Sequence, residues 1–330
     1  MGYGMNKVAV VTGANGYIGS LLCKELADRG WTVYGVYRNR ETSIPLHTNI
    51  IPVISDAPYV DISQLDKLGF DRQHGVDVFF HMAWDTVRRK DPISQINCSV
   101  GTIGYFIGDR MRPLRVKTFV FGSSFLRFAY DYDDATSDLE ATYYGGAKSF
   151  ATNMMGTYAM TNDSPIFIEA ILTNVYGPNS KGRFLDEIID SAVNNNIIVA
   201  RTSCKQVYDF VHETDAVDAL IHIAERHPKD KATGAYIIKG SKYDFTLKDY
   251  LHTVAVEAKM PVDRMILGST MATDHLFTGY RDWVKDAKSL GWRPSLNFDE
   301  GVRNLIKLRR KSWLQRVLTG VKRVFQAVIK

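Results

Sequence analysis

The chain has 330 residues, of which 45% are hydrophobic and 23% are charged, a composition typical of a globular protein with room for one large domain and a smaller one. No uninterrupted apolar run approaches the ~20 residues of a membrane-spanning helix and no signal peptide is evident, which argues against an integral membrane protein and predicts a cytoplasmic location. The net charge is +5, but nine Lys or Arg and no acidic residue lie in 303–330, so the rest of the chain is mildly acidic and gives no support for nucleic-acid binding.

The start of the chain predicts a strand, a glycine-rich turn and a helix. Val8 to Val11 is a β-branched run typical of a buried strand, and Tyr17 to Arg29 carries apolar residues at helical spacing. Such a turn uses its first glycine for a sharp bend, its second for close approach to a phosphate and its third for close helix packing. Free N–H groups of the helix N-terminus would then face a pyrophosphate, although an ordinary tight turn is the alternative. We expect this turn to bind a dinucleotide through Gly13, Asn15, Gly16, Tyr17, Ile18 and Gly19.

Strands and helices alternate along the next part of the chain. The strands expected after the first are Thr32 to Tyr37, Asn49 to Ile54, Val76 to His81, Val116 to Phe121 and Ile166 to Leu172. Helical segments between them include Ile93 to Arg110 and Tyr144 to Ala159. This alternation predicts an α/β fold with a doubly wound parallel Rossmann sheet over about residues 1–175, with later segments returning to it.

From about Tyr176 the pattern becomes less regular. Helices are expected at Gly182 to Asn195, Thr214 to Arg226 and Leu247 to Ala258, separated by short strands and loops. We interpret residues 176–302 as mainly a smaller, mixed α/β C-terminal lobe that binds substrate and closes over the site. Residues 303–330 are expected to form a basic amphipathic helix.

A tyrosine and a lysine four residues apart form the candidate catalytic pair. On a helix, Tyr144 and Lys148 would share a face. A nearby cation favours the phenolate, which makes Tyr144 a usable acid or base, and Lys148 could also hydrogen-bond the nicotinamide ribose. Ser123 and Ser124 end the fifth strand, where ligands gather in such sheets, and a serine there can donate to a substrate carbonyl. Either serine, and the Tyr/Lys spacing itself, could instead be structural.

The order of these motifs resembles the extended short-chain dehydrogenase/reductases, specifically the NAD-dependent epimerase/dehydratase family, which acts on nucleotide sugars. The resemblance covers roughly residues 6 to 310. It is carried by the glycine turn, His81-Met-Ala83-Trp84, Asn97-Cys-Ser-Val-Gly101-Thr102, Asn174-Val-Tyr-Gly177-Pro178, Asp209-Phe-Val-His-Glu-Thr-Asp215-Ala, and Leu290-Gly-Trp-Arg-Pro294 before Glu300-Gly301. The second and third of these are similar to the family's H-x-A and N-x-x-G-T segments, which places His81, Ala83 and Asn97 along the cofactor. The resemblance favours Ser124 over Ser123 as the catalytic hydroxyl and implies a substrate contact for Asn174.

Two departures from the family pattern concern the substrate. Tyr208 and Ile171 stand where many members have arginines, one of which binds the diphosphate. Contacts to the substrate phosphates are therefore expected from elsewhere, from Arg183, Arg201 or Arg281, while Tyr208 is expected to contact the substrate. The identity of the nucleotide stays open.

The end of the second strand bears on the choice of cofactor. NAD-specific sites usually place a carboxylate there, whereas this chain has Arg38, followed by Asn39 and Arg40. A guanidinium suits the 2′-phosphate of NADP, although a solvated basic loop is the alternative. We favour NADP and keep NAD open.

The segment after Ser124 bears on the reaction. Relatives that dehydrate sugars have an Asp-Glu pair where this chain has Phe125 and Leu126, which cannot move protons. We therefore expect reduction of a 4-keto (6-deoxy) nucleotide sugar by Ser124, Tyr144 and Lys148. The alternatives are a redox-neutral 4-epimerase with tightly bound NAD, a reductase of a hydrophobic ketone and a non-catalytic dinucleotide sensor. No metal is expected, because Cys23, Cys98 and Cys204 are far apart and lack metal-ligand spacing.

The basic tail and two helices suggest partners. Residues 307–330 place apolar side chains at three- and four-residue spacing beside basic ones, which suits peripheral contact with an anionic membrane surface, at the inner face of the membrane, or docking on the body or a second subunit. The resemblance also implies a homodimer through the helices Ile93 to Arg110 and Tyr144 to Ala159.

Overall fold

The computed structural model describes residues 6–38, 47–55, 60–108, 110–128, 141–161, 164–180, 182–241, 245–270 and 283–311. The chain divides into two compact units. The first consists of Met1–Thr173, Glu213–Lys239 and His275–Arg293, and the second of Asn174–His212, Gly240–Asp274 and Pro294–Lys330. Each unit is described separately.

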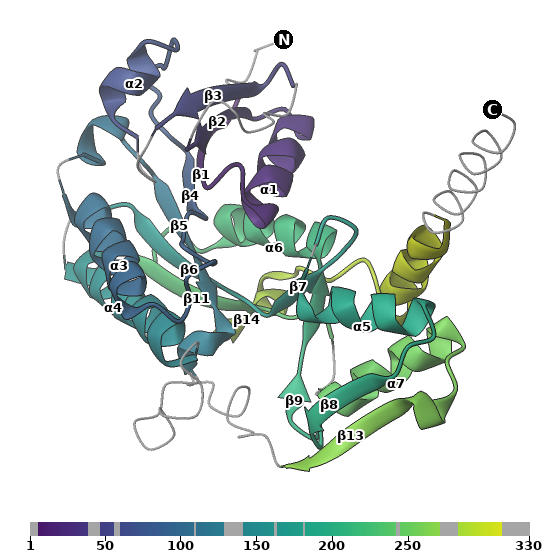
Figure 1. Ribbon diagram of the computed structural model, residues 1–330. Helices are drawn as coiled ribbons and strands as arrows, with labels where there is room; N and C mark the ends of the chain where they lie inside the picture. The colour runs from purple at the N-terminus through teal and green to yellow at the C-terminus, as the bar shows by residue number, and fades with distance from the viewer. Residues whose placement is uncertain are drawn as a thin grey trace, which may run out of the picture. The chain divides into compact units, whose positions relative to one another are not determined.

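The first unit is built on a parallel sheet of eight strands in the described part of the chain (Figure 1). The strands are β1 (Val8–Thr12), β2 (Thr32–Tyr37), β3 (Ile50–Ile54), β4 (Val78–His81), β5 (Thr118–Ser124), β6 (Ile166–Leu172), β11 (Thr233–Ile238) and β14 (Lys285–Asp286). Their order is β14-β11-β6-β5-β4-β1-β2-β3, and every neighbouring pair is parallel. The strand order reverses between β1 and β4, and ligands of such sheets bind beyond the carboxyl ends of the strands at that point.

Helices cover both faces of this sheet, as Figure 1 shows. α1 (Tyr17–Asp28) and α6 (Glu213–Arg226) lie together on one face, and α3 (Pro92–Ile107) and α4 (Gly146–Thr161) lie together on the other. Short elements are α2 (Ile62–Asp66) and the single turns η1 (Arg112–Leu114), η2 (Phe125–Phe128) and η6 (Ala287–Leu290). The predicted doubly wound parallel α/β fold is confirmed.

The core beneath α3 and α4 is aromatic. Side chains of a strand point alternately to the two faces of a sheet, and one face of β4 and β5 carries Phe79, Phe119 and Phe121. These rings pack against Phe106 of α3 and Met155 of α4. Their burial fixes α4 relative to the ends of β4 and β5.

The start of α4 differs from the predicted helix Tyr144 to Ala159. The α-helix begins at Gly146, and a π-helical turn, η3 (Ala141–Gly145), precedes it and contains Tyr144. Gly145, the last residue of this turn, lies so close to η2 that a Cβ would overlap the carbonyl oxygen of Leu126. π turns of this kind frequently occur at functional sites.

The second unit combines short strands with helices around its own core. The elements are β7 (Asn174–Tyr176), α5 (Phe184–Val193), β8 (Ile198–Thr202), β9 (Val207–Tyr208), β10 (Phe210–His212), β12 (Phe245–Thr246), α7 (Leu247–Ala258), η4 (Val262–Arg264), β13 (Met265–Thr270) and a helix over 298–311. The strands pair as β7 with β10, β8 with β13 and β9 with β12. Aromatic rings of Tyr176, Phe210, Tyr250 and Phe298 fill the centre of the unit.

Candidate functional site

The glycine turn lies at the carboxyl end of β1. Gly13 has a φ of +68°, which L-residues with a side chain rarely adopt, and it lies against the backbone of Ala83 just after β4. At Gly19, a Cβ would overlap the carbonyl oxygen of Gly13, so only glycine allows α1 to approach the turn this closely. Gly16 is the N-cap of α1 and is exposed, as is Asn15, and no side chain caps the first turn. The turn therefore exposes a helix N-terminus at the switch point of the sheet.

His81 connects the ends of β1 and β4 to α3. Its Nδ1 lies 3.0 Å from Thr12 Oγ1 and its Nε2 lies 3.0 Å from Thr102 Oγ1. Burial, and then the charge of Lys148, lowers the pKa of His81 to about 3, so the ring is neutral. Both ring nitrogens have partners within the protein, so the side chain joins the ends of these strands to α3. The backbone N–H of Ala83 donates to the same Thr12 hydroxyl at 3.3 Å.

Lys148 is buried among aromatic rings at the carboxyl end of β5. Its Nζ donates to the carbonyl oxygen of Gly122 at 2.6 Å and lies 3.8 Å from the centre of the Trp84 ring and 4.6 Å from that of Phe121. Burial lowers the pKa of Lys148 to about 7; the Cys98 thiol and the Glu169 carboxylate oppose this shift.

Tyr144 lies beside Lys148, as the sequence predicts. Lys148 Nζ is 5.8 Å from the centre of the Tyr144 ring, which is buried and meets Trp84 edge-on at 6.5 Å. A residue absent from the predicted site, Arg89, places its guanidinium carbon 5.0 Å from the centre of the same ring. The run Arg88-Arg89-Lys90 just after the H-x-A segment was the only sequence signal for it.

The two serines at the end of β5 have different surroundings. Ser124 is partly exposed, and its Oγ accepts a hydrogen bond from Leu126 N at 3.3 Å. Ser123 is buried, and its Oγ has no hydrogen-bond partner among the described residues. Leu126 connects Ser124 to Tyr144, because its carbonyl lies against Gly145.

A buried ion pair lies behind this arrangement and was not predicted. The Arg127 guanidinium in η2 binds the Glu169 carboxylate of β6, and their side chains are 4% and 1% exposed. Thr152 Oγ1 donates to Glu169 at 3.1 Å and Arg127 donates to Asn153 Oδ1 at 3.1 Å, both on α4. This pair connects the turn after Ser124 to the helix that carries Lys148.

The expected cofactor contact of Asn97 needs correction. Asn97 is exposed on α3, on the face that carries Ile93 and Val100, whereas Ser99 and Thr102 face inward. Asn97 precedes Gly101 by four residues, one more than N-x-x-G-T requires, and Cys98 takes the first position of that motif. Cys98 is partly buried and acts electrostatically on Lys148. We therefore place Cys98, not Asn97, beside the site.

In the second unit, the expected substrate residues Asn174 and Tyr208 contact each other. The Tyr208 hydroxyl donates to Asn174 Oδ1 at 3.3 Å, and Asn174 Nδ2 donates to the carbonyl of Asp209 at 3.1 Å. The buried Asp209 carboxylate accepts hydrogen bonds from the backbone N–H groups of Gly240 and Ser241. Asp209 thus orders the backbone on which this polar pair lies.

The basic residues expected to bind phosphates have different positions. Arg38 is exposed directly after β2, whose Val36 pairs with Thr12 at the glycine turn. Arg183 is exposed at the N-cap of α5. Arg201 lies in β8, and Arg281 lies outside the described residues.

The comparisons with known proteins identify the family. The NAD dependent epimerase/dehydratase family matches residues 9–238. The chain belongs to this family. The predicted resemblance to the extended short-chain dehydrogenase/reductases is confirmed, and the protein is an enzyme of the NAD dependent epimerase/dehydratase family.

Relatives of this epimerase/dehydratase family member cover nearly the whole chain. A CDP-abequose synthase of Salmonella muenchen is 22% identical over 92% of this chain and 99% of its own length. The UDP-glucose 4-epimerase of Thermotoga maritima, solved with UDP-glucose, is 17% identical with a TM-score of 0.68 and covers 94% of this chain and 100% of its own. MoeE5, solved with UDP-glucose and NAD, is 22% identical with a TM-score of 0.67 over 93% and 100% of the two chains. These solved structures share the fold.

The geometry of the glycine turn in the first unit suits the binding of a dinucleotide. The N-terminus of α1 has no side-chain cap, Asn15 and Gly16 are exposed there, and the close glycine contacts leave no room for side chains in the turn, which suits the binding of a pyrophosphate. Among the described residues, no three His, Cys, Asp or Glu side chains come together as a metal site. Within the described residues, no helix is long and apolar enough to cross a membrane.

Proposed function

We propose that the protein reduces the keto group of a 4-keto nucleotide sugar, with NADPH as the hydride donor. The observation that carries this proposal is the convergence of Ser124, Tyr144 and Lys148 at the carboxyl end of β5, within the unit that holds the glycine turn. The related CDP-abequose synthase makes a CDP-linked sugar by its name, which favours a CDP-sugar as the first substrate to test.

The proposed roles follow from the side chains. A bound NADPH supplies the hydride. Tyr144 gives the proton of its hydroxyl to the carbonyl oxygen, and Ser124 orients that carbonyl by a hydrogen bond. Lys148 has three N–H donors, of which the Gly122 carbonyl takes one, so it can also bind the ribose of the cofactor.

Reduction is favoured over dehydration by the two residues after Ser124. Phe125 is buried and apolar, and Leu126 is engaged through its backbone with Ser124 and Gly145, so neither side chain can move a proton. The 4-epimerase with tightly bound NAD is the alternative. It predicts a C4 epimer as product without net consumption of NADPH.

The preference for NADPH rests on Arg38. Arg38 is exposed directly after β2, the strand that pairs with β1 up to the glycine turn, and a guanidinium there can bind a 2′-phosphate. Dissociation constants for NADPH and NADH test this, together with an Arg38→Asp variant. We expect tighter NADPH binding that the substitution reverses, and tighter NADH binding by the unchanged protein would refute the preference.

For the nucleotide sugar, we propose Asn174 and Tyr208 as contacts, with Arg183 and Arg281 as candidate phosphate ligands. The mutual hydrogen bond of Asn174 and Tyr208 orients both polar groups before substrate arrives. Tyr208→Phe is expected to raise KM more than it lowers kcat, since the hydroxyl binds a part of the substrate remote from the reacting carbon.

The apolar surface of α3 and α4 supports a homodimer. The two helices carry only one charged residue, the buried Lys148, and they expose Ile93, Ile96, Val100, Phe150, Met154 and Met160. A surface that lacks charge and exposes large apolar side chains is typical of a homodimer contact. Figure 1 shows these helices side by side.

The role of the basic tail is a separate proposal. Residues 312–330 of the expected amphipathic helix lie outside the described residues. Within the second unit, Arg309 pairs with Asp186 at 2.8 Å and Arg310 donates to the carbonyl of Ala258 at 2.6 Å. Membrane contact would therefore use the segment after Lys311. Flotation with anionic liposomes, with and without residues 312–330, tests it, and equal flotation of both forms would exclude it.

A further inference from the structure

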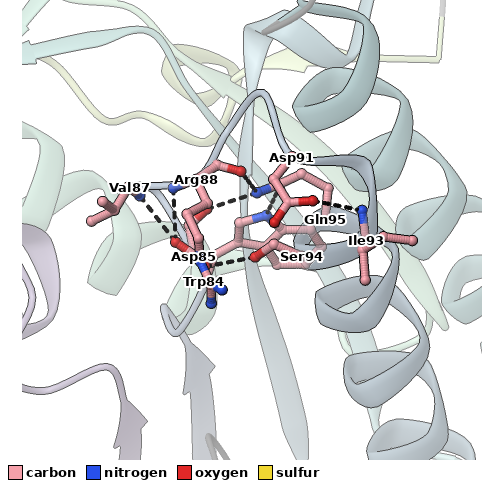
Figure 2. Close-up of polar contacts among 8 residues, drawn as sticks. All are labelled: Trp84, Asp85, Val87, Arg88, Asp91, Ile93, Ser94 and Gln95. Atoms are coloured by element: carbon pink, nitrogen blue, oxygen red, sulfur yellow. Dashed lines mark hydrogen bonds and ion pairs between the residues drawn. The ribbon is translucent and has the colours of Figure 1, made fainter.

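The loop between β4 and α3, residues 84–91, is held in place by its own hydrogen bonds, as Figure 2 shows. Trp84 Nε1 donates to Gln95 Oε1 at 2.8 Å, and Gln95 Nε2 donates to the carbonyl oxygens of Asp85 and Arg88, each at 2.9 Å. Gln95 is buried at the start of α3, so one side chain fixes both the Trp84 ring and the course of the loop.

The Asp85 carboxylate closes the loop. It accepts hydrogen bonds from the backbone of Val87 and Arg88, from Ser94 Oγ at 2.6 Å and from Arg88 Nε at 2.7 Å (Figure 2). Burial acts to raise the pKa of Asp85, but these hydrogen bonds lower it to about 2. Asp85 therefore stays ionised at working pH, and the Arg88 guanidinium is held by Asp85.

The next residue of this loop, Arg89, faces Tyr144. Its guanidinium carbon lies 5.0 Å from the centre of the Tyr144 ring, within the range of cation–π attraction, and both side chains are at least partly buried. The neighbouring cation, Lys148, is 5.8 Å from the same ring, but burial, and to a smaller extent the charge of Arg89 itself, lowers its pKa to about 7. An arginine keeps its charge at every pH at which the protein is folded.

The elements packed around Arg89 and Tyr144 contribute the other charged groups near them. α4 contributes Lys148 and α3 contributes Cys98, which acts on Lys148. η2 contributes Arg127, whose guanidinium binds Glu169 of β6. Within the described part of the loop itself, the Asp85 carboxylate is held by Arg88 and Ser94.

We propose that Arg89 is the permanent cation of the active site and stabilises the anionic form of Tyr144. The proposal rests on the proposed function in one respect, the role of Tyr144 as acid. In that step the carbonyl carbon accepts a hydride from the reduced nicotinamide, the carbonyl oxygen takes the proton from Tyr144 Oη, and the C=O double bond becomes C–OH. Tyr144 is left as a phenolate until solvent returns a proton, and the Arg89 charge lowers the energy of that phenolate.

The test is a titration of the Tyr144 phenol in the ligand-free protein. The ultraviolet absorbance of the phenolate is followed against pH for the unchanged protein and for Arg89→Gln, and the curve of the matching Tyr144→Phe protein is subtracted from each. For a unit charge beside the ring, screened as at a protein surface, we expect Arg89→Gln to raise the midpoint by about one pH unit. Arg89→Lys, which keeps the charge, and Lys90→Gln, which removes an exposed charge from the same loop, should keep the original midpoint.

The outcomes separate this proposal from the proposed function. A higher midpoint in Arg89→Gln alone supports the role of Arg89 whether or not the protein reduces a sugar. An unchanged midpoint in Arg89→Gln, with the thermal unfolding transition intact, overturns it, as does an equal shift in Lys90→Gln. Turnover by the Tyr144→Phe variant concerns only the proposed function.

Discussion

Lys148 Nζ lies 3.8 Å from the centre of the Trp84 ring and donates its hydrogen bond to a carbonyl, that of Gly122. Aromatic faces and one carbonyl do not replace the hydration that an ammonium loses on burial, which is why the pKa of Lys148 falls to about 7. A charged Lys148 therefore lowers the stability of the folded protein. Functional sites commonly keep such a destabilising group because their chemistry needs it.

The first prediction concerns stability against pH. The pKa of Lys148 is depressed in the folded state, so between about pH 7 and 10.5 the unfolded chain binds more protons and stability rises with pH. Lys148→Met removes this cost and should raise Tm by several degrees at pH 6, with a smaller gain at pH 9. The measurement is thermal unfolding of both proteins without cofactor. A variant that is less stable at pH 6, or a gain that grows with pH, would contradict the prediction.

The second prediction concerns the ion pair of Arg127 and Glu169. Arg127→Met leaves the Glu169 carboxylate buried without its cation, which should lower the free energy of unfolding by about 3–5 kcal/mol. The double variant Arg127→Met/Glu169→Leu removes both charges and should recover most of the loss. Chemical denaturation of the single and double variants checks this cycle, and additive losses would show that the two residues are not coupled.

The third prediction concerns the glycine turn. Gly19→Ala places a methyl group on the carbonyl oxygen of Gly13, so we expect lower stability and at least a tenfold weaker binding of NADPH. Gly156→Ala in α4 is the matched control, since its methyl group would be in ordinary contact with Phe167 and should be neutral or stabilise by about 0.5–1 kcal/mol. Fluorescence titration with NADPH and thermal unfolding measure both effects. Unimpaired binding by the Gly19 variant would show that α1 does not need this approach.

The fourth prediction concerns assembly. A charge at Val100 in the apolar surface of α3 and α4, as in Val100→Glu, should convert a dimer to a monomer. Val256→Glu in α7 is the control, because Val256 is equally exposed, at 57% against 58%. Size-exclusion chromatography with light scattering gives the masses. A monomeric starting protein, or a Val100 variant that stays dimeric, would refute the proposed contact.

The parallel sheet and its helices were predictable because most of these elements are long and buried enough to give a clear hydrophobic periodicity in the sequence. The strand Thr32 to Tyr37 and the helix Leu247 to Ala258 were predicted to the residue. The two-residue strand β14 and the three-residue strands β7 and β10 were not, since elements this short leave no hydrophobic period in the sequence.

Site residues that belong to a sequence motif could be predicted from the sequence. Site residues whose positions depend on packing in the folded protein could not. The pairing of Tyr144 with Lys148 follows from their spacing, although the π turn that carries Tyr144 brings Gly145 against Leu126, a contact that sequence does not reveal. Arg89 is one of several basic residues in a loop, and its position against Tyr144 depends on the folded course of that loop, which the hydrogen bonds of Asp85 and Gln95 help to hold. The error at Asn97 was one of register, and the burial of α3 corrects it.

The most direct test of the proposed function is consumption of NADPH with a panel of CDP-, UDP-, dTDP- and GDP-linked 4-keto sugars. The proposal predicts stoichiometric oxidation of NADPH with at least one of them, the CDP-sugar first, and loss of that turnover in Tyr144→Phe with cofactor binding retained. Conversion of a nucleotide sugar to its C4 epimer without net NADPH consumption would contradict reduction and establish the epimerase instead.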